Sequence, residues 1–93
     1  MKNIYKYVVF PNVVQSVRGK PLVVGWQFTE MLTIWCEVDE SENPPTYTDL
    51  AVVPTGGTVP EDSTYLGSAI SDYLVFHVYM KNDPNWVREM SQV

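Results

Sequence analysis

The sequence predicts an all-β fold, a small antiparallel β-sandwich or open barrel of about six to seven strands. Apolar and polar residues alternate in short runs, and glycines or prolines separate these runs, as is typical of strands joined by turns. No connection between the runs is long enough to hold the helix of a βαβ unit. The 93 residues, of which 45% are hydrophobic and 18% charged, have the size of one domain and the composition of a folded chain.

The strands expected in the first half cover residues 3–10, 13–18, 22–28 and 32–38. Pro11 and Asn12 end the first of these runs, and Gly19 closes the second. A tight connection at Thr29 and Glu30 makes the last two a hairpin. In its first arm, alternation places one set of side chains on a common face: Leu22, Val24, Trp26 and Phe28. In its second arm, alternation predicts a core face: Leu32, Ile34, Cys36 and Val38.

The strands expected in the second half cover residues 47–53, 65–70 and 73–80. Pro44 and Pro45 lie in the polar loop of residues 39–46 and exclude it from a central strand, because proline has no N–H to donate. Gly56 and Gly57 end the strand of residues 47–53, since glycine adopts positive φ at little cost. A turn at residues 71–72 leads into the final strand.

The final strand has the cleanest alternation and carries the only histidine. One of its faces is expected in the core: Leu74, Phe76, Val78 and Met80. The other face is aromatic and polar: Tyr73, Val75, His77 and Tyr79. This second face either completes another layer of core or contacts another molecule, because tyrosine buries a large area and keeps a polar end.

The chain divides into a β domain of residues 1–82 and a tail of residues 83–93. Asp83 and Pro84 are a typical helix start, with an N-cap carboxylate and a proline at the first helical position. Trp86 and Met90 would lie on the apolar side of one or two helical turns. Because so short a helix is marginal in isolation, it either packs on the β domain, contacts another subunit or frays, and we expect it to pack.

The charge balance restricts the partners of the protein. Eleven acidic and six basic residues give a net charge of −5, which disfavours nucleic acid and anionic membranes as partners. No apolar run approaches the length of a membrane span, and the N-terminus has no pattern of a secretory signal. Cys36 is expected to be a buried, unpaired thiol, which fits a reducing compartment, so we expect a cytoplasmic protein.

The residues that could carry chemistry do not combine into a catalytic set. His77 has no nucleophile and orienting acid in a recognisable motif, and one histidine with one cysteine makes a poor metal site. We therefore expect no enzyme activity, no metal and no cofactor. The binding residues expected instead are aromatic or polar: Trp35, Tyr73, His77 and Tyr79, with the loop of Thr55, Gly56, Gly57 and Thr58. This loop is either a simple turn or a nest of backbone N–H groups for an anion such as phosphate.

A second group of residues is expected at an interface. It combines acidic side chains with the apolar side of the tail: Glu37, Asp39, Glu40, Glu42, Trp86 and Met90. An acidic rim would suit a target that has a basic, nucleic-acid-binding groove. Exposed strand edges in so small a sheet also favour a homo-dimer or a higher oligomer.

Five segments together resemble a family of short, uncharacterised phage and prophage proteins: residues 4–7, 32–39, 55–60, 65–67 and 75–79. They match an Ile-Tyr-Lys-Tyr opening, a Leu-Trp-x-x-Val-Asp strand, a Thr-Gly-His loop, a Tyr-Ile-Gly-Thr strand and a Val-Phe-His-Val-Phe ending. Gly57 replaces the loop histidine of that pattern and Tyr79 replaces its last phenylalanine, whereas His77 is kept.

The resemblance implies a non-enzymatic phage-type accessory protein in the cytoplasm of the host cell. Such a protein binds and blocks a host protein, with a bacterial anti-phage defence component as the leading target, in the manner of an anti-CRISPR inhibitor. The alternative is a homo-oligomeric binder that sequesters a small, nucleotide-like immune signal between aromatic side chains and the loop of residues 55–58.

Overall fold

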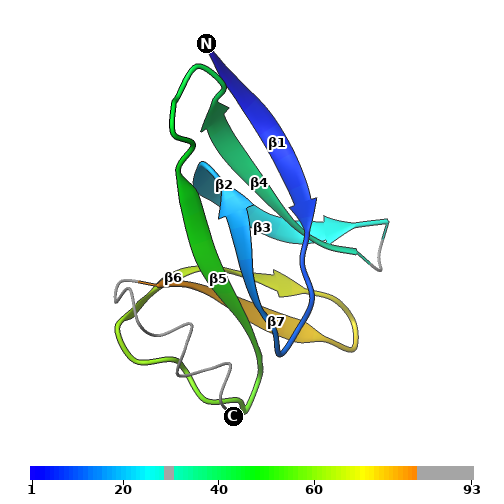
Figure 1. Ribbon diagram of the computed structural model, residues 1–93. Helices are drawn as coiled ribbons and strands as arrows, with labels where there is room; N and C mark the ends of the chain where they lie inside the picture. Colours follow the sequence, from blue (N-terminus) through cyan, green and yellow to red (C-terminus); the bar gives the residue numbers. More distant parts are fainter. Residues whose placement is uncertain (29–30, 82–93) are drawn as a thin grey trace.

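The computed structural model describes residues 1–28 and 31–81, which form seven antiparallel strands (Figure 1). They are β1 (Lys2–Val8), β2 (Val14–Arg18), β3 (Lys20–Gln27), β4 (Met31–Asp39), β5 (Tyr47–Pro54), β6 (Ser63–Ile70) and β7 (Val75–Lys81). The predicted all-β class and antiparallel sandwich are confirmed. The connection predicted at residues 29–30 and the tail of residues 83–93, with Trp86 and Met90, lie outside the described residues. No helix in the described ranges is long and apolar enough to cross a membrane.

The strands form two sheets, and the sheets do not close into a barrel. The three-stranded sheet has the order β1-β4-β3, and the four-stranded sheet has the order β2-β5-β7-β6. The loop between β4 and β5 lies beside the N-terminus, at the opposite end of the molecule from the connection between β5 and β6 (Figure 1). Glu40 helps to hold that loop in place, because its N–H donates to the carbonyl of Met1 at 3.3 Å.

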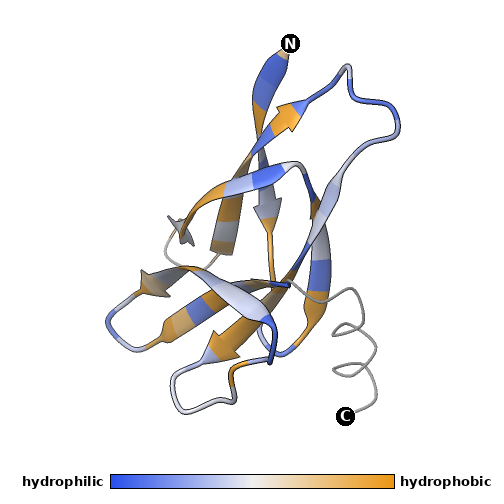
Figure 2. Cartoon of the chain, turned by 90° about the vertical axis from the view of Figure 1, so that its left-hand side faces the viewer, coloured by the Kyte–Doolittle hydropathy of each residue, from blue (hydrophilic) through white to orange (hydrophobic). Residues whose placement is uncertain are grey.

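The core lies between the facing sides of the two sheets. The predicted core face of β4 is confirmed, since Leu32, Ile34, Cys36 and Val38 are all buried. From the other sheet come further buried side chains: Val17, Leu50, Val52, Ala69 and Val78. Hydrophobic and hydrophilic colours alternate along several strands in Figure 2, as expected where one face of a strand is covered and the other is not. β5 differs, because its residues 50–53 are all buried.

The prediction that Leu74 lies in the core is wrong, because Leu74 is 51% exposed. β7 begins at Val75, and residues 71–74 form the turn that joins it to β6. The Ser71 N–H donates to the Leu74 carbonyl at 2.8 Å, and the Ser71 hydroxyl accepts from the Leu74 N–H at 3.1 Å. The turn that Ser71 closes therefore ends at Leu74, two residues later than the predicted turn at residues 71–72. Tyr73 projects from this turn with 95% of its surface exposed.

The common face predicted for residues 22–28 is also only partly correct. The β3–β4 register shifts between Pro21 and Val23, so a bulge at Leu22 changes which side chains face inward. Pro21 is buried, and Leu22 is instead exposed. Val24 and Trp26 do share a face, as predicted, and both pack against the core.

Candidate binding sites on the sandwich

His77 lies on the outer face of the four-stranded sheet, between two hydroxyl groups. Its Nδ1 is 2.7 Å from the Ser68 hydroxyl, and its Nε2 is 3.0 Å from the Thr55 hydroxyl. The Tyr65 hydroxyl is 2.5 Å from Ser68 and extends this chain of polar groups. In a neutral imidazole one ring nitrogen donates and the other accepts, so the two hydroxyls fix the ring without needing a charge. Of the predicted binding residues, the structure brings Thr55 and His77 into contact.

Tyr65 and Ser68 were not predicted as part of this site. In a regular strand, residues three apart point to opposite faces. The β6–β7 register shifts between Tyr65 and Gly67, however, and the resulting bulge turns Tyr65 and Ser68 to the same side. Gly67 within the strand is the sequence signal that could have indicated a bulge. The bulge also places Tyr65 against Tyr79, with ring centroids 5.5 Å apart in an edge-to-face arrangement.

The glycine loop beside His77 has part of its backbone already in use. The Gly57 N–H donates to the Pro54 carbonyl at 2.9 Å, and the Thr55 N–H donates to the Val75 carbonyl at 3.4 Å. These two amides are therefore committed within the protein. Gly56, which has a φ of 90°, and Thr58 are both exposed. The loop thus offers fewer backbone donors than a full anion nest would.

Trp35 and Tyr73 do not join His77 and Tyr79 on one surface. Trp35 lies on β4 in the three-stranded sheet, in one row with Lys6 of β1 and Val23 of β3. His77 and Tyr79 lie on the other sheet, and Tyr73 lies in the β6–β7 turn. The aromatic residues predicted as a single surface are thus distributed over three places.

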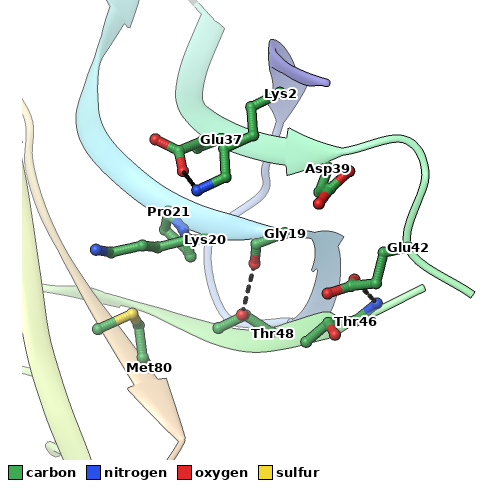
Figure 3. Close-up of a pocket in the computed structure, with 10 residues that line it drawn as sticks. All are labelled: Lys2, Gly19, Lys20, Pro21, Glu37, Asp39, Glu42, Thr46, Thr48 and Met80. Atoms are coloured by element: carbon green, nitrogen blue, oxygen red, sulfur yellow. Dashed lines mark hydrogen bonds and ion pairs between the residues drawn. The ribbon is translucent and has the colours of Figure 1, made fainter. Parts of the chain in front are cut away.

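The acidic residues predicted at an interface gather at the end of the sandwich that carries the N-terminus. Glu37, Asp39 and Glu42 border a pocket of about 480 Å³ together with Lys2 and Lys20 (Figure 3). The Lys2 ammonium lies 3.3 Å from the Glu37 carboxylate, whereas Glu42 accepts from the N–H of Thr46 at 2.7 Å. Hydrogen bonds from the side chain and the N–H of Ser41 lower the pKa of Asp39 below its usual value. The pocket is therefore of mixed charge and is not uniformly acidic.

Glu40 has a separate role from the other three acids. It accepts hydrogen bonds from the side chains of Asn3 and Tyr5. The hydrogen bond to Glu40 is the main cause of a raised pKa of the Tyr5 hydroxyl. Glu40 therefore fixes the β4–β5 loop to β1.

The opposite end of the three-stranded sheet carries an apolar pocket that the sequence did not predict. Its volume is about 470 Å³, and its lining is mainly apolar and comes from hydrophobic residues: Val8, Val9, Phe10, Pro11, Trp26, Met31, Leu32, Leu74 and Phe76. Phe10 is 61% exposed, and Met31 and Leu74 are exposed beside it. We call this surface, formed by Phe10, Met31 and Leu74 around the pocket, the apolar end.

Two aromatic side chains of this pocket, Trp26 and Phe76, are held in place by the core. Trp26 packs edge-to-face against Phe76 with ring centroids 6.0 Å apart. The indole N–H of Trp26 is buried and has no hydrogen-bond partner among the described residues. Because these rings are packed against the core, the pocket has a preformed aromatic lining.

The remaining reactive group of the described chain is the thiol of Cys36. It is fully buried, and burial raises its pKa to about 11. A thiol with so high a pKa is a poor nucleophile near neutral pH. Residues 1–28 and 31–81 contain no group of three or more side chains that could hold a metal ion.

Comparison with known proteins assigns a family and no activity. No curated protein and no solved structure matches the chain. The family described as a domain of unknown function, DUF7352, matches residues 1–89. This match covers all seven strands. The protein therefore belongs to the uncharacterised DUF7352 family.

Proposed function

We propose that the protein is a non-enzymatic accessory protein that binds a partner protein and blocks it. The apolar end carries this proposal, because Phe10, Met31 and Leu74 expose a contiguous apolar surface around one pocket. Exposed patches of this kind mark interaction sites in soluble proteins. A pocket of about 470 Å³ with an apolar lining suits an aliphatic or aromatic side chain of a partner.

The partner we propose is a protein of a bacterial host, with an anti-phage defence component as the leading target. The resemblance of five segments to short phage and prophage proteins supports this context. The net charge of −5 favours a target with a basic surface, such as a nucleic-acid-binding groove. In this proposal the apolar end supplies affinity, and the charge guides the encounter.

The test is capture of a stoichiometric partner from host lysate by the tagged protein, followed by calorimetry with the purified partner. Phe10→Ser removes an aromatic side chain that is 61% exposed, so the fold should persist while the affinity falls at least tenfold. Tyr47→Ser is the matched control, because Tyr47 is 60% exposed and pairs with Arg18 outside the apolar end. Equal affinities for the two variants would rule out the apolar end as the contact.

A second candidate is supported by the contact between Thr55 and His77. We propose it as a site for a small, nucleotide-like signal, in which Tyr65 and Tyr79 offer aromatic faces and His77 offers a ring nitrogen. The 3.0 Å distance between Thr55 and His77 places a loop hydroxyl and an imidazole at one point of the surface. Both groups can hydrogen-bond a phosphate or a ribose hydroxyl.

Calorimetry against cyclic dinucleotides and ADP-ribose-type nucleotides tests this candidate. Thr55→Val keeps the shape of the side chain and removes its hydroxyl, so a nucleotide that binds here should lose at least tenfold in affinity. Thr46→Val, at the opposite end of β5, is the control. If no nucleotide gave a measurable heat of binding, a nucleotide site at Thr55 and His77 would be ruled out.

A further inference from the structure

The free edge of β1 presents side chains and backbone groups that suit an added strand. β1 lies at one edge of the three-stranded sheet and pairs with β4 on its other side. The Val9 N–H donates to the Leu32 carbonyl at 2.9 Å, and the Glu40 N–H donates to the Met1 carbonyl at 3.3 Å. Both contacts continue the β1–β4 register, in which Lys2 pairs with Asp39 and Val8 with Thr33.

This register identifies the backbone groups that point away from β4. In an antiparallel ladder, alternate residues of a strand bond to the same neighbour, and the residues between them face the other way. Because Val9 bonds to Leu32 of β4 and Met1 to Glu40, directly after β4, the odd-numbered residues face β4. The N–H and C=O groups at the free edge therefore belong to the even-numbered residues: Lys2, Ile4, Lys6 and Val8.

The same four residues also place their side chains on the outer face of the sheet. Their order is cation, apolar, cation, apolar, and Ile4 is 60% exposed. The ion pair of Lys2 with Glu37 joins two solvent-exposed side chains, so it holds Lys2 only weakly. Lys6 has no ion-pair partner among the described residues. The edge thus carries positive charge on a chain whose net charge is −5.

We propose that the β1 edge binds an extended acidic segment of the partner protein as an added strand. This inference rests on the proposed protein-binding function. An antiparallel segment would place carboxylates opposite Lys6 and Lys2 and apolar side chains opposite Val8 and Ile4. Val8 also lines the apolar pocket, so one segment can follow the edge and reach the apolar end.

A second copy of the protein is a poorer occupant of this edge. Antiparallel pairing of two β1 strands would bring Lys2 and Lys6 of both copies onto one face, and like charges on facing strands repel. Lysines on an edge strand are a common device against such self-pairing. The charge pattern therefore favours a partner of opposite sign.

Amide hydrogen exchange of the full chain with a synthetic probe tests the inference. The probe is the blocked peptide Val-Thr-Glu-Thr-Val-Thr-Glu, and its counterpart with Lys in place of Glu is the charge control. The acidic peptide should slow exchange at Ile4, Lys6 and Val8 at least tenfold and leave Tyr5 and Tyr7 unchanged, because those two amides face β4. The lysine peptide should bind at least tenfold more weakly. Equal binding of both peptides, or protection confined to other strands, would overturn the proposal.

Two variants separate the edge from the rest of the surface. Ile4→Pro removes an N–H that β4 does not use, and edge strands tolerate proline at such positions. Ile4→Ala removes the same apolar side chain and keeps the N–H. Ile4→Pro should weaken the acidic peptide at least tenfold relative to Ile4→Ala, with both variants shown to be folded by thermal denaturation. Lys6→Glu leaves Lys2 opposite one peptide charge and puts a carboxylate opposite the other, so it should abolish the preference between the two peptides; an unchanged preference would contradict a role for charge.

The outcomes also distinguish this inference from the proposed function. If Ile4→Pro captures the same host protein as the unmodified chain, the edge inference is wrong and the protein-binding function stands. If sedimentation shows a dimer that Ile4→Pro dissociates, a second copy occupies the edge and the proposal is overturned. If no host protein is captured but the acidic peptide protects the edge amides, the edge binds as inferred and the proposed function is wrong.

Discussion

Substitution of Gly19 and Gly56 by alanine separates backbone strain from steric collision in this fold. Both glycines have positive φ, 88° for Gly19 and 90° for Gly56, so alanine is strained at either position. At Gly56 no heavy atom lies within 4 Å of the position that a Cβ would occupy. At Gly19 that Cβ would lie 2.3 Å from the carbonyl oxygen of Glu37, which is far inside van der Waals contact.

The expected costs follow from these two environments. A residue with a Cβ in this backbone region costs about 1–2 kcal/mol, partly offset by the lower entropy of the unfolded alanine chain, so Gly56→Ala should destabilise by about 1 kcal/mol. Gly19→Ala must also move the turn away from Glu37. That movement strains the hydrogen bonds from the Gly19 N–H to the Thr46 carbonyl, 2.8 Å, and from the Thr48 hydroxyl to the Gly19 carbonyl, 2.9 Å. Each lost bond costs about 1 kcal/mol, so the total should be about 3–4 kcal/mol.

Urea denaturation followed by tryptophan fluorescence measures both variants. A domain of this size has a free energy of unfolding of about 5–14 kcal/mol, so Gly19→Ala should shift the midpoint strongly and Gly56→Ala only slightly. If the two variants differed by less than about 0.5 kcal/mol, the close packing of the β2–β3 turn on β4 would be refuted.

Three further predictions concern charge, the thiol and the core. Burial of Asp49 would raise its pKa, but hydrogen bonding by Lys81 at 2.6 Å contributes to a net lowering. Its carboxylate therefore stabilises the fold above the unfolded-state pKa of about 4, and this stability is lost as the pH falls through the lower folded-state pKa. Asp49→Asn should cost about 2 kcal/mol at neutral pH and flatten the acid-side slope in urea titrations, and an unchanged slope would contradict this. Cys36, whose pKa is raised to about 11, should react with a disulfide reagent only as fast as the protein opens, and rapid labelling of the native state would contradict its burial. Ile34→Ala should cost about 2–5 kcal/mol in thermal denaturation, whereas Ile70→Ala, at a site 72% exposed, should cost less than about 0.5 kcal/mol.

The sequence was a good guide where one strand face is buried and the other is not. The alternation of β4 predicted its core face correctly, because a period of two fixes which side chains share a face. Alternation was a poor guide where a strand contains a bulge. The bulge at Leu22 and the bulge between Tyr65 and Gly67 each shift the pattern by one residue, and alternation alone cannot locate such a shift. The late start of β7 depends similarly on the Ser71 turn.

The candidate sites were harder to predict because each combines distant parts of the chain. His77 was predicted as a binding residue, but its contact with Ser68 depends on the β6 bulge and on the pairing of β6 with β7. The apolar end combines Phe10, which follows β1, Met31, which begins β4, and Leu74, which precedes β7. Their proximity results from the sheet order, which no local pattern encodes.

The β1 edge shows how sheet order adds meaning to a pattern that is already visible in the sequence. Alternation in residues 3–10 predicted a strand and showed that Lys6 shares a face with Ile4. It could not show whether that strand is central or at an edge. Once β1 is known to lie at the edge, the hydrogen bond from the Val9 N–H to Leu32 determines which backbone groups remain available. These groups belong to the residues with the alternating cationic and apolar side chains, so affinity from the backbone and selectivity from the side chains would act on the same segment of a partner.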